Sequence, residues 1–513
     1  MTRTITELAC FVRAFAEKAR TSPEKVFATF TGTPITFGEL DAMSDTFAAH
    51  LRHKGLKRGD AVAVMMRNSR YSLAILFGLA KAGIVWVPVN AQLKGEGLAY
   101  ILEHCSAKVV ICDQDLLDVI GASGAETSAF DLIVAGDPDG PRALEPVFRQ
   151  TLPFDEVSPD PSDLFAVMYT SGTTGRPKGV MVTHGMMRLS GEAVKHLSRA
   201  TDGDVFLVWE PLYHIGGAQL IILPLLADIV LAMVERFSAS RFWDEVRRSG
   251  ATHIHYLGGI LQILLKQPEH PDDRNHGVRV AWGGGCPREI WTAFEQRFGV
   301  EIRECYGMTE ASSLTTCNDE RIVGAVGRPM PWFSVDVVDD EGLPVPIGEK
   351  GEIVVSTSLP GAIFNGYLAN PEATAKALRD GRLHTGDRGS IDAAGVLWFH
   401  GRLTDSVRCK GENVSAFEVE TVAGRHPSVE DCAMIGVATD VGEQDIKLFL
   451  KPKAGQTLDL RSFSDWLGER LASYQMPRYL ELVEEFDRTP SQRIMKHKLS
   501  TDVAQSWDRL ATR

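Results

Sequence analysis

One loop combines glycines, hydroxyl side chains and a lysine in a way that suits phosphate binding. The run Tyr169–Gly179 reads Tyr-Thr-Ser-Gly-Thr-Thr-Gly-Arg-Pro-Lys-Gly and follows the apolar stretch 164–167. Glycine lets backbone N–H groups approach an anion, and successive amides and hydroxyls form a concave donor nest. Lys178 adds a charge that can reach phosphate oxygens. Because Pro177 stands where a Walker A motif needs its second glycine, we predict a phosphate loop of another kind.

Three later runs, together with this loop, resemble the signatures of the ANL adenylate-forming superfamily and follow their order. Tyr306–Glu310 reads Tyr-Gly-Met-Thr-Glu, Thr385–Asp387 reads Thr-Gly-Asp, and Gly401–Asp405 reads Gly-Arg-Leu-Thr-Asp. The resemblance covers nearly the whole chain. Around residues 238–246, 361–367 and 426–446 the sequence is most similar to crotonobetaine/carnitine-type CoA ligases.

The resemblance implies an acid–thiol ligase, an AMP-forming acyl-CoA synthetase. Such an enzyme activates a small-molecule carboxylic acid with ATP and Mg²⁺ as acyl-AMP, releases pyrophosphate, and transfers the acyl group to the thiol of CoA. Two anions must meet in the first step, so the protein has to neutralise charge and align groups without supplying a nucleophile. The residues with predicted catalytic roles are Lys178, His214, Thr309, Glu310 and Arg493.

The resemblance also assigns the parts of ATP. The phosphate loop with Lys178 would hold the β- and γ-phosphates, Glu310 and Thr174 would bind Mg²⁺, and Thr309 would approach the α-phosphate. We expect Lys178 and Glu310 to face solvent in a cleft. Tyr306 offers a face to adenine, and Asp387 with Arg402 would contact the ribose. The predicted ATP-binding set is Thr170, Ser171, Gly172, Thr173, Thr174, Gly175, Lys178, Gly284, Gly285, Tyr306, Gly307, Met308, Thr309, Asp387 and Arg402.

The predicted acyl pocket is rich in aromatic and histidine side chains. It comprises Trp209, His214, His255 and Gly259. His214 matches a recurrent histidine at the carboxylate entrance of the family, but a lone histidine in an apolar run also suits a packed core, and both readings stay open. The composition favours a small or medium acid with a polar or charged group over a long fatty chain. Aromatic faces would suit a quaternary ammonium.

The C-terminal region carries the expected thiol-transfer residues and one departure from the family. Lys410 and Gly411 resemble the loop that lines the pantetheine tunnel for CoA, with a hinge at Asp405. Near the C-terminus the family has a lysine that bridges carboxylate and α-phosphate, and here Arg493 stands in its place. If this segment is helical, Lys496 lies one turn further on and would substitute for it.

Composition and charge exclude several other classes of protein. The chain has 513 residues, which calls for two or more domains, and its net charge is −13, from 54 basic and 67 acidic residues. Such a balance disfavours nucleic acid and anionic membranes as partners. Residues 1–20 read as an amphipathic helix, not a signal peptide, and the apolar stretch 220–234 is too short for a membrane span. The eight cysteines contain no Cys-x-x-Cys pair, which favours a reducing cytoplasm.

The pattern along the chain predicts an α/β fold in two domains. Strand-like and helix-like runs alternate from residue 36 to 112, in 205–234 and in 251–311, as βαβ units around mostly parallel sheets require. Short strands in 321–400 suggest a small β-barrel. We predict an AMP-binding adenylation domain over 1–403 and a small mobile α+β domain over 404–513. The runs expected to form elements are 61–66, 71–81, 83–89, 109–112, 205–209 with a long apolar helix after it, 334–338, 352–356, 419–425, 429–437, 446–451 and 460–471.

Two alternatives to an acyl-CoA synthetase remain open. An adenylating enzyme that loads a carrier-protein phosphopantetheine would use the same residues, although no carrier domain is fused here. An impaired, nucleotide-binding homologue is suggested by Arg493 alone, and the presence of Lys178, Glu310 and Asp387 weighs against it. The sequence does not fix the oligomeric state, a dimer included.

Overall fold

The structure is a computed structural model that describes the chain except residues 1–4, 6, 151–153, 155–158, 171–176, 404–405, 410–411, 439–443, 472, 474, 490–491 and 512–513. It divides into two compact units. The first comprises Met1–Cys286, Ile290–Ser334 and Val355–Leu383, and the second comprises Pro287–Glu289, Val335–Val354 and His384–Arg513. The predicted domain boundary at residue 404 and the hinge at Asp405 fall outside the described residues and stay predictions.

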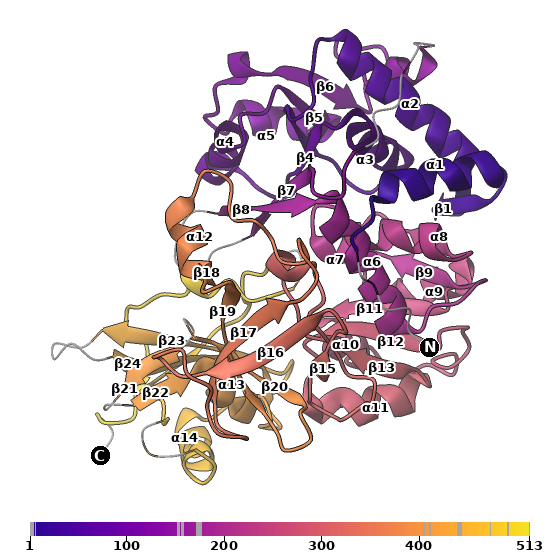
Figure 1. Cartoon of the computed structure of the whole chain (residues 1–513). Coiled ribbons are helices and arrows are strands. Elements are labelled where there is room, and N and C mark those ends of the chain that lie inside the picture. The colour runs from indigo at the N-terminus through magenta and orange to yellow at the C-terminus, as the bar shows by residue number, and fades with distance from the viewer. Residues whose placement is uncertain are drawn as a thin grey trace. The chain divides into compact units, whose positions relative to one another are not determined.

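A six-stranded sheet in the first unit carries the predicted phosphate loop. Its strand order is β6-β5-β3-β4-β7-β8, and all neighbours are parallel except the β7–β8 hairpin (Figure 1). The alternation predicted for residues 61–112 is confirmed, with helix α3 (Arg70–Ala82) between two of these strands. The strands are β3 (Ala61–Met65), β4 (Val85–Pro88), β5 (Val109–Asp113), β6 (Asp131–Ala135), β7 (Leu164–Thr170) and β8 (Lys178–Thr183).

A seven-stranded sheet in the same unit carries most of the other predicted site residues. Its order is β13-β12-β11-β9-β10-β1-β2, and only the terminal β1–β2 pair is antiparallel. The carboxyl ends of the parallel strands therefore meet at one edge, where α/β proteins bind ligands. The strands are β1 (Val26–Phe30), β2 (Thr33–Thr36), β9 (Val205–Val208), β10 (Val230–Met233), β11 (His253–Leu257), β12 (Val280–Gly284) and β13 (Glu301–Glu304).

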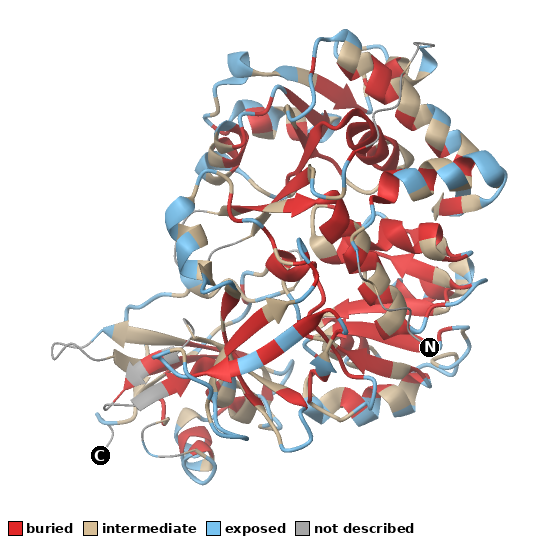
Figure 2. Ribbon diagram, in the orientation of Figure 1, coloured by how far each residue is buried: buried red, intermediate tan, exposed pale blue. Residues whose placement is uncertain are grey.

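The cores of both parallel sheets are buried, and helices cover them (Figure 2). Helix α2 packs against α3, and α1 packs against α2 and α6. Among the described helices, none unites the length and the apolar character that a bilayer crossing requires. Besides α3, the described helices with at least eight residues in this part of the chain are α1 (Phe11–Thr21), α2 (Phe37–His53), α4 (Gly95–His104), α6 (His184–Ser198), α9 (Phe242–Ser249) and α11 (Arg288–Phe298).

Two helix predictions need correction. The helix expected over residues 1–20 begins only at Phe11. The single long apolar helix expected after residue 209 is wrong, because three short segments stand there: α7 (Ile215–Ala218), a 3₁₀ turn (Gln219–Ile222) and α8 (Leu223–Leu226). Gly216 and Gly217 weaken the helix, and Pro224 lacks the N–H that a continuous helix needs.

The strands predicted at 334–338 and 352–356 lie in a five-stranded sheet. Its order is β16-β17-β19-β18, and β20 also pairs with β19. The small barrel expected here is thus a half-barrel sheet. The strands are β16 (Phe333–Val338), β17 (Gly351–Thr357), β18 (Leu378–Arg379), β19 (Arg382–Ile391) and β20 (Leu397–Arg402).

The C-terminal part of the second unit has its own apolar core, which includes Phe463, Leu448 and Val419. The helix–strand–strand–helix order predicted there is confirmed, and with it the α/β fold class. A four-stranded sheet has the order β23-β24-β25-β26, and β21 pairs with β22. The elements are β21 (Ser406–Cys409), β22 (Glu412–Ser415), α13 (Ala416–Ala423), β23 (Val429–Ala438), β24 (Gln444–Pro452), α14 (Leu460–Gly468), β25 (Tyr479–Leu482) and β26 (Trp507–Asp508).

A buried lysine on α3 yields a first prediction, for stability. The Lys81 side chain is 2% exposed, and its Nζ lies 2.5 Å from Asp41 Oδ1 and 2.6 Å from Asp45 Oδ1 on α2. Lys81→Met leaves these two carboxylates facing each other without a cation. We expect the free energy of unfolding to fall by about 2 kcal/mol, less than for a fully buried pair because both carboxylates are partly exposed. Lys54→Met, which breaks the exposed pair with Asp131, is the control, and an equal loss in both variants would contradict the account.

Candidate active site

The phosphate loop connects the two strands of a hairpin. Strand β7 ends at Thr170, which lies opposite Lys178, the first residue of β8. A strand therefore precedes the loop, as predicted. The five predicted phosphate-loop residues Ser171, Gly172, Thr173, Thr174 and Gly175 lie outside the described residues, so their contacts with ATP stay predictions.

Lys178 and Glu310 are linked through a tyrosine that the motifs did not reveal. The Nζ of Lys178 lies 4.9 Å from the centre of the Tyr367 ring. The Tyr367 hydroxyl donates a hydrogen bond of 2.8 Å to Glu310 Oε1. Tyr367 reaches this position because its segment pairs with β8, where the Leu368 N–H donates to the Gly179 carbonyl. The structure thus brings together the predicted phosphate lysine and the predicted metal carboxylate.

Glu310 is more enclosed than expected. Its exposed fraction is 5%, so the expectation that it faces solvent is wrong, while Lys178 is half-buried. Thr309 is 8% exposed in the same short 3₁₀ turn (Thr309–Ala311). A carboxylate is a hard oxygen donor of the kind that Mg²⁺ prefers, so Glu310 fits its predicted role. The second predicted ligand, Thr174, lies outside the described residues.

The predicted adenine residues lie at the carboxyl ends of β12 and β13. Gly284 ends β12 and Gly285 follows it, while Tyr306 comes two residues after β13. The Tyr306 N–H donates to Thr316 Oγ1 at 3.0 Å, and Tyr306 is 7% exposed. A side chain at Gly307 would place its Cβ 1.8 Å from the Ser313 carbonyl oxygen, which explains glycine there. Met308 follows it, half-buried, so these residues share one edge of the sheet.

Two of the predicted acyl-pocket residues, Trp209 and His255, belong to a stacked aromatic group around β9 and β11. His255 stacks on Trp282 with 4.2 Å between ring centres, and the Trp209 indole N–H donates to the His255 carbonyl at 2.8 Å. His214 is half-buried and caps α7, and a Cβ at Gly259 would meet no atom within 4 Å. The structure therefore brings Trp209 and His255 together, and Gly259 leaves an open backbone position at the start of α10 (Ile260–Leu265).

A buried carboxylate beside this group escaped sequence reasoning. Glu210 is 2% exposed, and its Oε2 lies 2.9 Å from Nδ1 of His255. A Cβ at Gly216 would lie 2.4 Å from the same Oε2 atom, so glycine at 216 leaves room for the carboxylate. The signal in the sequence was an acidic residue placed between Trp209 and Pro211 in an otherwise apolar run. A buried carboxyl group thus lies beside the aromatic rings of the predicted pocket residues.

The predicted ribose residues lie together in the second unit. Asp387 on β19 is opposite Arg402 on β20, and Arg402 Nε lies 3.2 Å from Asp387 Oδ1. The Asp387 N–H donates to the Thr385 hydroxyl, which itself donates to the Ile353 carbonyl. Glu352, which the motifs did not indicate, accepts the Gly386 N–H at 3.0 Å. The Thr-Gly-Asp turn is therefore fixed on both sides.

The C-terminal segment does not form the helix on which the role of Lys496 depended. The Thr489 N–H donates to the Arg493 carbonyl, and Ile494 forms an antiparallel bridge with Arg488, which is not a helical pattern. Arg493 is exposed, whereas Lys496 Nζ lies 2.9 Å from Glu420 Oε1. The condition for substitution by Lys496 is thus not met. Lys410 and Gly411, predicted for CoA, lie outside the described residues.

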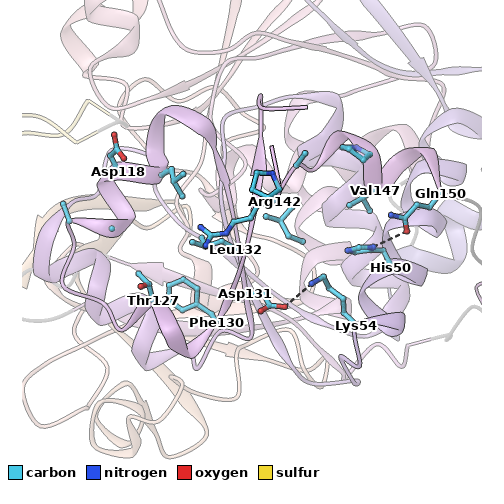
Figure 3. A pocket seen from close by; sticks show the side chains of 17 residues that line it. His50, Lys54, Asp118, Thr127, Phe130, Asp131, Leu132, Arg142, Val147 and Gln150 are labelled. Carbon is cyan, nitrogen blue, oxygen red and sulfur yellow. Dashed lines mark hydrogen bonds and ion pairs between the residues drawn. The ribbon is translucent and has the colours of Figure 1, made fainter. Parts of the chain in front are cut away.

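A cavity of about 910 Å³ lies elsewhere in the first unit, against strand β6 at the edge of its sheet. Figure 3 shows His50 and Lys54 on one side of it and Arg142 near its middle. Lys54 pairs with Asp131 across the cavity wall at 3.1 Å. Among the described residues, none of those predicted for the site lines this cavity, so it belongs to a different region from the described motif residues.

Comparison with known families decides what these motifs belong to. The model of the AMP-binding enzyme family matches residues 15–368, and that of the AMP-binding enzyme C-terminal domain matches residues 418–493. The chain belongs to the AMP-binding enzyme family. This AMP-binding enzyme is 31% identical over 460 residues to a crotonobetaine/carnitine–CoA ligase of Salmonella paratyphi B, a match that covers 87% of this chain and 89% of the relative. A ligase of the same name from Escherichia coli O8 is 32% identical over 463 residues, with the same coverage.

Solved structures agree with this assignment. ATP-bound MatB from Rhodopseudomonas palustris superposes with a TM-score of 0.86 at 28% identity, covering 95% of this chain and 97% of MatB. The anthranilate CoA ligase AuaEII in complex with anthranoyl-AMP shares the fold, with a TM-score of 0.85 at 24% identity over 96% and 97% of the two chains. The AMP-binding enzyme is accordingly an acid–thiol ligase. It activates a carboxylic acid with ATP as acyl-AMP, releases pyrophosphate, and transfers the acyl group to CoA.

The Lys178–Tyr367–Glu310 arrangement predicts the cost of removing each charge. Lys178→Ala and Glu310→Gln should lower the rate of acyl-AMP formation by a factor of about 10² or more, the scale of losing one electrostatic contact to a developing charge. Tyr367→Phe keeps both charges and removes only the hydrogen bond to Glu310, so we expect a loss of about tenfold at most. Pyrophosphate release under single-turnover conditions measures all three, with circular dichroism to check folding. Near-normal turnover in Lys178→Ala or Glu310→Gln would remove that residue from the mechanism.

Proposed function

We propose that the AMP-binding enzyme binds ATP as its Mg²⁺ complex through the motif residues named above. Lys178 and the phosphate loop contact the β- and γ-phosphates, and Glu310 holds the metal ion together with Thr174. When bound, Mg²⁺ neutralises phosphate charge and favours departure of pyrophosphate. The observation that carries this proposal is the hydrogen bond from Tyr367 to Glu310, with Lys178 above the same ring.

The nucleoside end of ATP is assigned in the same way. Tyr306 and the backbone of 284–285 contact adenine, with Gly307 and Met308 beside them. Asp387 accepts hydrogen bonds from the ribose hydroxyls, and Arg402 supports it through their 3.2 Å pair. A carboxylate has two acceptor oxygens and can accept hydrogen bonds from two hydroxyl donors, which is what a ribose offers.

In the proposed first step, an oxygen of the substrate carboxylate attacks the α-phosphorus of ATP and pyrophosphate leaves. Thr309 and Arg493 stabilise the charge on the α-phosphate oxygens. In the second step the thiol sulfur attacks the acyl carbon, the bond to the AMP oxygen breaks, and the thiol proton is released to solvent. Lys410 and Gly411 guide the pantetheine thiol, and His214 orients the substrate carboxylate.

The substrate we propose is a small carboxylic acid with a cationic group at its far end. The two ligases named above act, by their names, on carnitine and crotonobetaine. The geometry that supports a similar class here is the buried Glu210 beside His255, next to the faces of Trp209 and Trp282. The binding of a quaternary ammonium is favoured both by a negative charge and by aromatic faces.

We place the enzyme in the cytoplasm, where ATP and CoA are supplied. The second candidate acceptor, a carrier-protein phosphopantetheine, would also require the loop at 410–411.

A pair of acids with equal shape and different charge tests the substrate class. One is 4-trimethylammoniobutanoate and the other is 5,5-dimethylhexanoate, in which carbon replaces nitrogen. We expect kcat/KM for pyrophosphate release to favour the cationic acid at least about tenfold, and Glu210→Gln to remove most of that preference. Offering CoA and a phosphopantetheinylated carrier protein as acceptors, each with the preferred acid, shows which thiol receives the acyl group. Equal use of both acids by the unmodified enzyme would contradict the proposed class.

The proposed role of Arg493 is tested by separating the half-reactions. Arg493→Ala should depress ATP–pyrophosphate exchange much more than thioester formation from supplied acyl-AMP, because the guanidinium acts at the α-phosphate. Arg493→Lys should retain activity, since a compact ammonium supplies the same charge. Lys496→Ala is the matched control and should change little, as Lys496 is paired with Glu420. If Lys496→Ala instead causes the larger loss of ATP–pyrophosphate exchange, the catalytic cation has been assigned to the wrong residue.

A further inference from the structure

A fully enclosed carboxylate joins the ends of three neighbouring strands in the first unit. Glu304, the last residue of β13, is 3% exposed. Its Oε2 accepts a hydrogen bond of 2.6 Å from the Tyr256 hydroxyl on β11. Its Oε1 accepts the Gly285 N–H at 2.5 Å, and its Oε2 also accepts the Cys286 N–H at 3.1 Å, both from the loop after β12. One side chain therefore fixes residues from all three strands.

This loop has little freedom apart from those hydrogen bonds. Gly283 has φ +155°, and a Cβ there would lie 1.9 Å from the Tyr256 carbonyl oxygen. Gly285 has φ +93°, and its Cβ would lie 3.1 Å from Gly258. The backbone is thus pressed against the end of β11 on one side, while Gly285 itself is exposed on the other. The two amides that point inward find their acceptor in Glu304.

A buried carboxylate without a basic partner is costly unless hydrogen bonds replace its water. The three donors named above are neutral, and the two loop amides can only donate, so they favour the ionised acid, whose charged oxygens accept stronger hydrogen bonds. The Tyr256 hydroxyl can adapt to either form, because it also lies 3.3 Å from the Arg303 carbonyl oxygen, to which it can donate. The arrangement therefore favours the ionised state of Glu304. The free-energy cost of burying this carboxylate is offset by the three hydrogen bonds, and these same bonds fix the position of the loop.

We infer that Glu304 is a positioning residue for nucleotide binding: its ionised carboxylate holds Gly285 and Cys286 so that the exposed side of the loop can receive adenine. The inference rests on the proposed function, in which 284–285 contact the ring. Protonation of Glu304 removes the charge that strengthens the hydrogen bonds from the two loop amides, and the loop is then held less firmly. ATP affinity is thereby linked to the charge of a residue that does not touch ATP.

The sign of the pH dependence follows from the burial of Glu304. Burial raises its pKa to about 7, although the hydrogen bonds from Tyr256, Gly285 and Cys286 oppose the shift. Above pH 7 the Glu304 carboxylate is ionised and holds the loop. Below pH 7 Glu304 is protonated and holds the loop less firmly. The other titratable groups that face it are Tyr256, Cys286 and Cys305. Burial raises the pKa of Tyr256 and of Cys305 well above their usual values, so both stay neutral around pH 7.

The test compares the unmodified enzyme with Glu304→Gln, which resembles the protonated acid in shape and hydrogen bonding. We measure KM for ATP and kcat by pyrophosphate release from pH 6 to 8.5, and AMP binding by calorimetry over the same range. In the unmodified enzyme KM for ATP should rise as pH falls through 7. In Glu304→Gln it should be about tenfold higher at pH 8 and lack this rise, with kcat and KM for the acid within about threefold. The titration of ATP itself is common to both proteins and cancels in the comparison.

Tyr256→Phe provides a second, milder variant. It removes one donor to the carboxylate, so the midpoint of the KM rise should move to higher pH, a shift that mere loosening of the fold would not produce. If the pH dependence persists unchanged in Glu304→Gln, or if KM for the acid rises as much as KM for ATP, the inference is wrong. Calorimetric AMP binding is independent of any acid substrate. A failure to activate acids would therefore count against the proposed function and leave the role of Glu304 to be judged by binding.

Discussion

Carboxylates buried at or just after the ends of parallel strands are the constraint on which the site depends. Glu210 follows β9, Glu304 ends β13, and Glu310 lies in the turn beyond it; all three are at most 5% exposed. Glu304 and Glu310 accept hydrogen bonds from the hydroxyls of Tyr256 and Tyr367, and Glu210 Oε2 lies 2.9 Å from His255 Nδ1. A carboxylate removed from water is stable only while such donors stay in place, so the carboxylates and the strand ends fix one another.

This arrangement suits a reaction between two anions. A protein with a net charge of −13 cannot attract ATP and a carboxylate by its overall field, and local cations must do so. In the first unit Lys178 lies above the ring of the tyrosine that holds Glu310, and in the second Arg402 pairs with Asp387. Positive and negative groups are therefore held next to each other before ATP arrives, which lowers the reorganisation needed during the reaction.

The sequence predicted what short motifs and periodicity determine. The α/β class, strand β7 before the phosphate loop and the order of elements after residue 415 follow from local patterns, and the structure confirms them. Tyr367 could not be predicted, because it reaches Glu310 only when its segment pairs with β8. Glu304 gave no distinct signal, because it lies two residues before the Tyr-Gly-Met-Thr-Glu motif in a strand whose four residues, Glu-Ile-Arg-Glu, include three charged ones. Its partners come from two other strands, which adjacency in the sequence does not reveal.

The most direct test of adenylate formation follows oxygen atoms. With an acid labelled by ¹⁸O in both carboxylate oxygens, attack on the α-phosphorus leaves one labelled oxygen bridging carbon and phosphorus. Thiolysis by CoA then breaks the carbon–oxygen bond. AMP recovered after one turnover should therefore carry one ¹⁸O atom, as measured by mass spectrometry, and pyrophosphate should carry none. Label in inorganic phosphate, with ADP as the nucleotide product, would contradict the mechanism, because it would show attack at the γ-phosphorus.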